Sequence, residues 1–95
     1  MKKTKKVPYF VYIMRCRDKS LYTGITNNIK RRLKEHNSSR NGARYTSARR
    51  PVRCVYKESQ PDISSAMKRE RQIKKLPRKK KQQLIRSKWA THPKI

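Results

Sequence analysis

The chain has 95 residues, and its 29 Lys and Arg against 5 Asp and Glu give a formal net charge of +24. This length suits one domain with a modest core, and no apolar run reaches the roughly 20 residues of a membrane-spanning helix. Because such a charge opposes compaction, we expect a polyanionic partner, with nucleic acid favoured over an anionic membrane surface. A ribosome-associated or purely charge-driven binder is the rival interpretation.

The first elements expected in chain order are two strands joined by a short turn. Tyr9–Cys16 is apolar in both alternating sets, as in a strand covered on both faces. A second strand, Leu21–Ile25, follows the turn. We predict a three-residue tip, Asp18–Ser20, or an equivalent bulge, because an odd-numbered tip places Tyr12 and Tyr22 on one face of the sheet. A two-residue turn places them on opposite faces.

Helix and turn signals define the remaining elements. Asn27 or Asn28 caps the first helix, Asp62 or Ser64 caps the second, and Pro77 separates the second from the third. The expected elements are a helix over 29–37, a loop over 38–51, a strand over 52–56, and helices over 63–76 and 78–88. Their order, β-β-α-β-α-α, predicts an α+β domain with a three-stranded antiparallel sheet flanked by helices.

The predicted domain covers residues 8–87, between a basic arm (1–7) and a C-terminal tail (88–95). Cys16 and Cys54 are the only two cysteines, and together with two histidines they do not form the ligand pattern of a metal site. We expect two reduced core thiols, with a disulfide between neighbouring strands as the alternative.

Two basic residues of the first predicted helix lie where apolar residues are expected. Ile29 and Leu33 mark its buried stripe, and Arg32 and His36, four residues apart, lie on or beside that stripe. A basic side chain in this position often reaches solvent with its charged end, and His36 alone is compatible with ordinary packing.

An acidic residue, Glu70, falls on the apolar stripe of the second predicted helix. The other members of this stripe are Ile63, Ala66, Met67, Ile73 and Leu76. Burying an unpaired carboxylate costs several kcal/mol. Glu70 is therefore expected either to pair with an arginine or to bind a cation.

These polar residues, at these spacings, resemble the GIY-YIG nuclease superfamily, and in particular its small single-domain bacterial branch. The stretch "VYI" at 11–13 stands where the first family signature does, and "YTG" at 22–24 where the second does. The helix "NNIKRRLKEH" follows them, and "GARYT" at 42–46 matches a "GAKYT"-like stretch of that branch. Val11 replaces the first glycine of the signature, and Gln82 stands where many members carry asparagine.

The resemblance implies a phosphodiester hydrolase with a divalent cation. Tyr12 and Tyr22 would line the cleft, with one of them assisting deprotonation of the attacking water. Arg32 would neutralise the scissile phosphate, and His36 would help to position or activate the nucleophile. Glu70 would bind one Mg²⁺ or Mn²⁺, because Mg²⁺ keeps several waters and takes few protein ligands.

The arginine-rich loop over 38–51 is expected to border the cleft, to be mobile without ligand and to grip nucleic acid. Tyr45 within it either stacks on a base or anchors the loop onto the sheet. The expected nucleic-acid contacts are Arg44, Tyr45, Arg49, Arg50, Lys74 and Gln82.

We expect a DNA endonuclease that acts in the bacterial cytoplasm, at the nucleoid, without an obligate protein partner or a membrane. Because no added recognition domain is evident, we expect it to recognise DNA structure rather than sequence. The alternative is a non-catalytic nucleic-acid-binding module on the same fold. Glu70 favours the nuclease, since a pure binder gains nothing from an acid that faces a polyanion.

Overall fold

The computed structural model describes residues 8–38 and 44–91. The predicted basic arm, the middle of the predicted loop and the last residues of the predicted tail lie outside these ranges. The strands β1 (Tyr9–Arg15), β2 (Leu21–Thr26) and β3 (Arg53–Gln60) form an antiparallel sheet in the order β2-β1-β3. The first strand in the sequence is therefore the central strand of the sheet.

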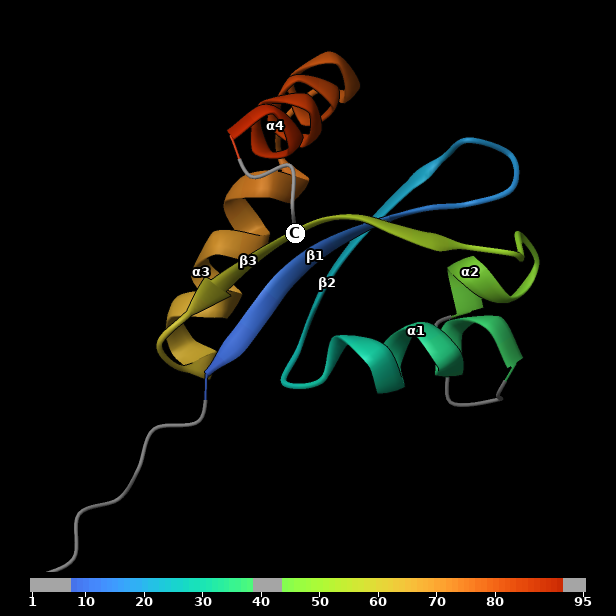
Figure 1. Cartoon of the computed structure of the whole chain (residues 1–95), viewed down its shortest axis with the longest axis horizontal. Helices are drawn as coiled ribbons and strands as arrows, with labels where there is room; N and C mark the ends of the chain where they lie inside the picture. Colours follow the sequence, from blue (N-terminus) through green and yellow to red (C-terminus); the bar gives the residue numbers. More distant parts are fainter. Residues whose placement is uncertain (1–7, 39–43, 92–95) are drawn as a thin grey trace, which may run out of the picture.

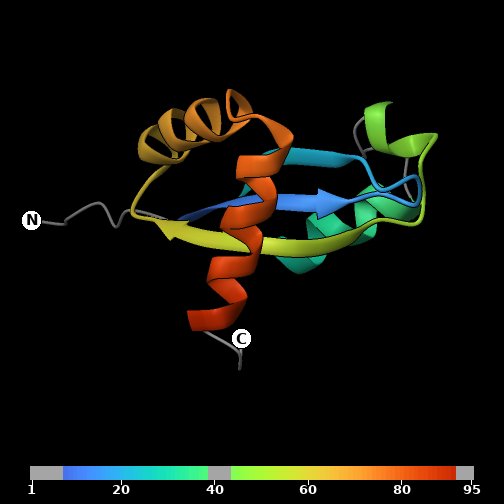
Figure 2. The same ribbon diagram turned by 90° about the horizontal axis from the view of Figure 1, so that it is seen from above.

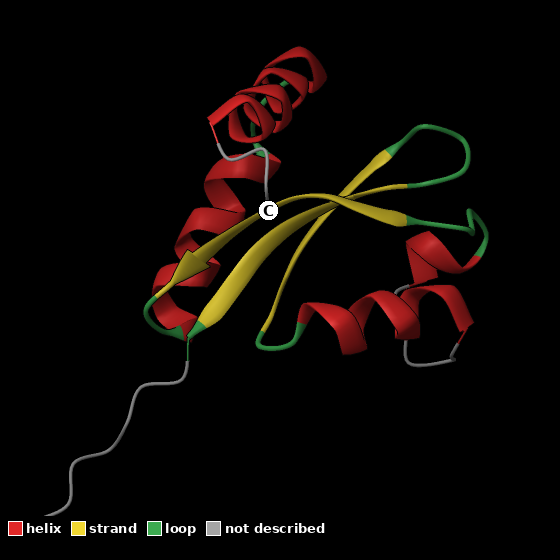
Figure 3. Ribbon diagram, in the orientation of Figure 1, coloured by secondary structure: helices red, strands yellow, loops and turns green. Residues whose placement is uncertain are grey.

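Helices cover both faces of this sheet. The helices α1 (Ile29–Ser38) and α2 (Arg44–Ser47) lie on one side of the strands, and α3 (Ile63–Lys74) and α4 (Arg78–Thr91) lie on the other (Figures 1 and 3). Seen from above, α4 crosses the strands at a steep angle (Figure 2). The predicted α+β class and the three-stranded antiparallel sheet are confirmed.

The alternation of β1 divides the core into two clusters. Val11 and Ile13 pack with residues of α3 on one face, whereas Tyr12 and Met14 pack with residues of α1 on the other. All four side chains are buried. This explains why the strand is apolar in both alternating sets, since a strand covered on both faces has no solvent side.

The hairpin places the two signature tyrosines on the same face, as predicted. Met14 lies opposite Tyr22, and the Cys16 amide donates to the Ser20 carbonyl at 2.9 Å, which leaves Arg17–Lys19 as a three-residue tip. This tip lies one residue earlier than predicted, with Lys19 in the left-handed region at φ 72°. The rings of Tyr12 and Tyr22 are 6.4 Å apart, centroid to centroid.

Three elements differ from the predictions because tertiary contacts outweigh local sequence signals. β3 continues to Gln60, since β1 begins at Tyr9 and supplies a pairing partner for the polar residues after Tyr56. A short helix, α2, forms within the predicted loop. α4 runs to Thr91 rather than ending near 88, because the chain carries no proline or glycine between Pro77 and Pro93.

The stripe predicted for the second helix is only partly correct. Ala66 and Ile73 are fully buried, but Ile63 and Met67 are each 46% exposed. Asp62 caps α3 by accepting a hydrogen bond from the Ser65 amide at 2.9 Å. Asn28 caps α1 by accepting one from the Arg31 amide, also at 2.9 Å.

The two thiols are free, as predicted, with Cys16 buried and Cys54 half-buried. Burial raises the pKa of the Cys54 thiol. Within the described ranges, no helix combines the length and the apolar character needed to cross a membrane.

Candidate active site

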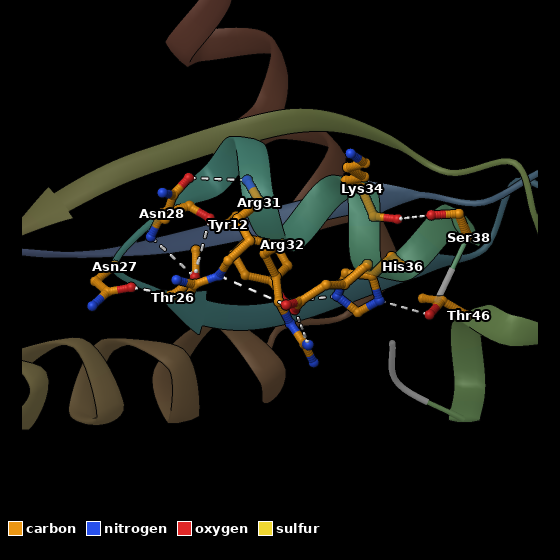
Figure 4. A network of polar contacts seen from close by, with 11 residues as sticks. Tyr12, Thr26, Asn27, Asn28, Arg31, Arg32, Lys34, His36, Ser38 and Thr46 are labelled. Atoms are coloured by element: carbon orange, nitrogen blue, oxygen red, sulfur yellow. Dashed lines mark hydrogen bonds and ion pairs between the residues drawn. The ribbon is translucent and has the colours of Figure 1, made fainter. Parts of the chain in front are cut away.

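The buried hydroxyl of Tyr12 is at the centre of a polar network between β1 and α1 (Figure 4). Tyr12 is 1% exposed, and its Oη lies 3.0 Å from His36 Nε2. Burial raises the pKa of Tyr12 to about 12, although a hydrogen bond from Arg32 opposes that shift. The phenol therefore carries its proton at neutral pH in the free protein.

His36 joins Tyr12 to the short helix α2. Its ring is fully buried, and Nδ1 lies 2.7 Å from Thr46 Oγ1. Burial lowers the pKa of His36 to about 4, and the nearby charge of Arg32 acts in the same direction. The imidazole is therefore neutral at pH 7, with one nitrogen donating and the other accepting.

Arg32 lies at one end of this network and can only donate hydrogen bonds. The Tyr12 oxygen therefore accepts from Arg32. One hydrogen bond joins the Tyr12 hydroxyl to His36 Nε2, and a second joins His36 Nδ1 to Thr46 Oγ1. The network thus runs from Arg32 through Tyr12 and His36 to Thr46.

Arg32 remains charged at the edge of this network. Its Nη1 donates to Glu35 Oε1 at 2.8 Å, and its side chain is 24% exposed. Burial alone would lower the pKa of Arg32, but its bonds to Glu35 and Tyr12 hold that pKa above the usual range. A permanent positive charge therefore lies beside a phenol and close to solvent.

Tyr22 lies between the buried network and a surface aromatic residue. Its ring meets the His36 ring edge-on with centroids 5.2 Å apart, and it stacks on the Tyr45 ring with centroids 5.8 Å apart. The Arg49 guanidinium lies 4.0 Å from the Tyr45 ring centroid. Tyr22 is half-buried, whereas Tyr12 is inaccessible, so Tyr22 is the tyrosine closer to solvent.

Gly24 gives the Tyr12 hydroxyl its space. It pairs with Tyr12 across the hairpin, and a Cβ at this position would lie 2.5 Å from the Tyr12 Oη. A real side chain cannot approach so closely without displacing the phenol. The glycine of "YTG" is therefore required by the position of the Tyr12 ring.

Glu70 lies on α3, in the inward position between Ala66 and Ile73. Its side chain is 22% exposed, and its Oε2 pairs with Lys74 Nζ at 3.2 Å. The Glu70 charge is one of the causes that raise the pKa of Tyr12, after burial and the charge of Tyr22. The carboxylate therefore acts electrostatically on the buried tyrosine from a different element.

Glu58 is the more enclosed acid, with a side chain 14% exposed, and the sequence arguments did not select it. It accepts hydrogen bonds from Tyr56 and from Gln60, and it pairs with Arg69 Nε at 2.8 Å. Burial alone would raise the pKa of Glu58, but the bonds from Arg69 and Tyr56 hold it below the usual range. Glu58 therefore has the role of structural ion-pair partner that the sequence analysis considered for Glu70.

The other acids are also engaged within the fold. Asp18 binds Ser20 and Arg49 at the hairpin tip, Glu35 pairs with Arg31 and Arg32, and Asp62 caps α3. Among the ion pairs of the described residues, that of Glu70 is made with a single exposed lysine, Lys74.

A single carboxylate fits a hydrated divalent cation. In the described parts of the chain, no group of three or more His, Cys, Asp or Glu side chains could enclose a metal ion. Mg²⁺ is commonly held by one or two carboxylates, with water and substrate phosphate completing its shell. The oxygen donor of Glu70 suits this mode and does not suit a closed structural site.

The predicted nucleic-acid contacts lie at three places in the fold: around α2, on α3 and on α4. Tyr45, Arg49 and Arg50 hold the chain around α2: Arg49 pairs with Asp18 at 3.1 Å, and Arg50 Nε donates to the His36 carbonyl at 2.6 Å. Arg44 is exposed at the start of α2, and Lys74 lies beside Glu70. Gln82 lines a cavity under α4.

Thr46 and Gly24 are the site residues that sequence reasoning missed. Thr46 lies within the "GARYT" stretch, which carries the family resemblance but whose composition predicts a loop. Gly24 is one of only two glycines in the chain and lies inside a strand, where glycine often marks a close approach of another group. Both signals were present in the sequence.

Fold and site together define a small basic α+β domain with a buried Arg-Tyr-His-Thr network and one nearby carboxylate. The sequence model described as the GIY-YIG catalytic domain matches residues 8–83. The chain therefore belongs to the GIY-YIG family, as the signatures indicated.

Relatives of similar size occur in bacteria and archaea. A UPF0213 protein of Desulfotalea psychrophila is 54% identical over 84 residues, which cover 88% of this chain and 76% of that protein. A UPF0213 protein of Haloquadratum walsbyi, an archaeal relative, is 49% identical over 76 residues, or 80% of this chain and 84% of that protein. The family branch thus extends beyond the bacteria expected from the sequence.

Two structures solved by solution NMR share the fold. The UPF0213 protein of Bacillus halodurans is 43% identical, with a TM-score of 0.56 and coverage of 85% of each chain. A protein from E. faecalis is 33% identical, with a TM-score of 0.57 and coverage of 90% of each chain.

Proposed function

We propose that the protein is a metal-dependent DNA endonuclease that hydrolyses phosphodiester bonds at the Tyr12–His36 centre. The observation that carries this proposal is the convergence of an arginine, two tyrosines and a neutral histidine, with a carboxylate acting on the same phenol from α3. Family membership supports the reaction class.

In this proposal Arg32 binds the scissile phosphate. Its charge is permanent, its side chain reaches solvent, and a guanidinium donates two parallel hydrogen bonds to phosphate oxygens. A positive charge fixed before the reaction stabilises the negative charge that develops on those oxygens. Glu35 and Tyr12 hold the guanidinium in place from within the protein.

The two tyrosines take different roles. Tyr22, which is closer to solvent, contacts the attacking water, whereas the buried Tyr12 positions Arg32 and the phosphate through its oxygen. His36 fixes the Tyr12 hydroxyl and supports the Tyr22 ring by edge-on contact.

Glu70 holds the divalent cation in this proposal. A bound Mg²⁺ or Mn²⁺ would supply positive charge for the phosphate oxygens and lower the pKa of coordinated water. Glu70 would then exchange its ion pair with Lys74 for the cation, and Lys74 would be available to contact the DNA backbone. In this proposal the protein recognises the shape of the DNA rather than its sequence.

The alternative is a nucleic-acid-binding module without turnover. The pairing of Arg32 with Glu35 and of Glu70 with Lys74 favours it, because both groups are satisfied without a substrate or cation. A cleavage assay on linear duplex, flap and junction DNA, with Mg²⁺, Mn²⁺ or EDTA, separates the two functions. We expect metal-dependent cutting that Tyr22→Phe reduces at least about 100-fold; binding of all substrates without any cutting would contradict the nuclease.

A further inference from the structure

A cavity of about 390 Å³ opens on the face of the sheet opposite the Tyr12–His36 centre. We call it the arginine pocket, and its lining comprises Arg15, Leu21, Arg53, Val55, Arg78, Gln82, Ile85 and Arg86. Arg15 follows Val11 and Ile13 in the alternation of β1, so its side chain lies on the face covered by α3 and α4. β1 and β3 supply one wall, and α4, which crosses the strands in Figure 2, supplies the other.

The charge of the arginine pocket is not compensated within the described protein. Its lining contains four arginines and no acid. The ion pairs between described residues engage other arginines, namely Arg31, Arg32, Arg49 and Arg69. Positive charges that share one cavity repel one another, so their convergence is stabilised when an anion binds.

One of these arginines is already held in place. Arg78 Nη2 donates to the Lys19 carbonyl at 2.7 Å, which ties the start of α4 to the tip of the β1–β2 hairpin. On the sheet, Arg15 pairs directly with Arg53 across the β1–β3 ladder, so both side chains point the same way. The pocket is therefore built on rigid strands and on an anchored helix rather than on a loop.

A second hollow of about 290 Å³ adjoins the arginine pocket and shares two of its residues. Arg15 and Arg53 line both, and Arg17 and Lys19 extend the basic lining towards the hairpin tip. Cys16 and Pro51 complete it, again without an acid. The two hollows form a basic surface longer than one isolated anion requires, which favours a chain of anions.

We infer that the arginine pocket binds the phosphate backbone of a nucleic-acid strand, at a site separate from the Tyr12–His36 centre. The forked donors of arginine match phosphate oxygens, and the apolar floor of Leu21, Val55 and Ile85 accommodates a sugar. The class of partner rests on the proposed function, whereas the presence of an anion site rests on the pocket alone.

The Tyr12–His36 centre lies between β1 and α1, whereas the arginine pocket lies between the strands and α4, so the two sites can hold two segments of the substrate at once. One linear duplex at the catalytic face leaves the arginine pocket empty, whereas a branched DNA offers a second arm to it. The arginine pocket thus gives this domain a physical basis for preferring branched DNA.

The test compares two double variants that remove the same charge. The pocket variant, Arg15→Gln with Arg53→Gln, removes the two arginine charges that line both hollows. The control variant, Lys68→Gln with Arg71→Gln, removes two exposed charges from α3, outside the lining of either hollow. Binding of a fluorescent flap DNA is measured by anisotropy at several salt concentrations, with EDTA present so that no cutting occurs.

We expect the pocket variant to lose at least about tenfold in affinity and about two units of salt slope, and the control to lose less than half of each. Arg86→Gln alone should lower the slope by about one. Equal losses in the pocket and control variants would overturn the inference, as would an unchanged slope. Circular dichroism on each variant establishes that it is folded before binding is compared.

Two further experiments distinguish this inference from a free-phosphate site and from the proposed nuclease function. NMR titration with inorganic phosphate and with a short DNA strand should perturb the pocket amides in both cases; a response to phosphate alone would identify a free-phosphate site and overturn the nucleic-acid assignment. With Mg²⁺, the pocket variant should cut linear duplex at the wild-type rate and lose its preference for the flap. If the wild-type protein cuts nothing, the proposed function fails while the binding comparison still decides the pocket.

Discussion

The two faces of the sheet differ in how they use their polar side chains. Under α1 and α2, the polar groups are buried and bound to one another, from Arg32 through Tyr12 and His36 to Thr46. Under α4, several arginines surround an open cavity without an acid partner among the described residues. Paired groups hold one geometry before a ligand arrives, which suits chemistry, whereas unpaired charges suit the binding of a polyanion.

The comparison extends to two acids near α3. Glu58 is enclosed by Tyr56, Gln60 and Arg69, and it fastens β3 to the helix. Glu70 has a single ion pair with an exposed lysine. We therefore assign Glu58 to stability and Glu70 to function, and the following predictions test this division and the properties of the buried network.

The largest expected loss of stability follows Glu58→Gln. This change leaves Arg69 without its carboxylate partner and should lower the free energy of unfolding by about 3 to 4 kcal/mol. The matched change Glu70→Gln should cost less than about 1 kcal/mol, because its ion pair is partly exposed. Urea denaturation of both variants makes the comparison; equal losses would break the division between the two acids.

The buried His36 should make stability fall in mild acid. Its pKa is lowered to about 4 in the folded protein, against an ordinary value of 6.5, so the unfolded chain binds the additional proton between these values. The contribution is full above pH 6.5 and is lost as the pH falls towards 4, by roughly 2 to 3 kcal/mol. Unfolding measured from pH 7 to 4.5 should show this slope in wild type and not in His36→Gln; a flat wild-type profile would contradict the assignment.

Gly24→Ala tests the fit of the Tyr12 ring. The added Cβ would lie 2.5 Å from the Tyr12 Oη, which is held by His36 and cannot move freely. Overpacking of this kind should cost about 2 kcal/mol. Thermal unfolding measures the loss, with Thr23→Ser as a control at the adjacent buried strand position. An unchanged melting temperature in Gly24→Ala would show that the phenol has room to move.

A smaller stability effect than that of Gly24→Ala is expected from Arg49→Ala combined with Arg50→Ala. Arg49 pairs with Asp18 at a partly exposed position, so its loss should cost only about 1 kcal/mol. The sequence predicts in addition that both arginines contact DNA, which requires weaker binding and a flatter salt dependence. Anisotropy titrations check this second effect; an unchanged salt slope would leave both residues with a structural role around α2.

Much of the fold is readable from the sequence because its signals are local. The alternation in β1, the cap at Asp62 and the odd-numbered hairpin tip each depend on residues close together in the chain. An odd number of residues in the hairpin tip is enough to place Tyr12 and Tyr22 on one face. The end of β3 cannot be predicted from local signals, because the polar residues after Tyr56 pair with a strand more than forty residues earlier in the chain.

The site is harder to predict from the sequence, because contacts between distant elements decide which polar residues are buried. Thr46 belongs to a polar stretch that reads as loop, and only the fold of α2 against α1 brings it to His36. The arginine pocket combines residues of β1, β3 and α4 that have no common spacing. Glu58 was overlooked for the same reason, since its burial depends on Tyr56 and Arg69 from two different elements.

The most direct test of the central proposal is Glu70→Gln in one preparation, assayed for cleavage, melting temperature and DNA affinity. We predict that Mg²⁺-dependent cutting falls at least about 100-fold while the melting temperature stays within a few degrees of wild type. Affinity should stay equal or rise, since a negative charge has been removed beside the DNA. Wild-type cutting by Glu70→Gln would contradict the proposed metal site, and a loss of stability like that of Glu58→Gln would assign Glu70 to the structure.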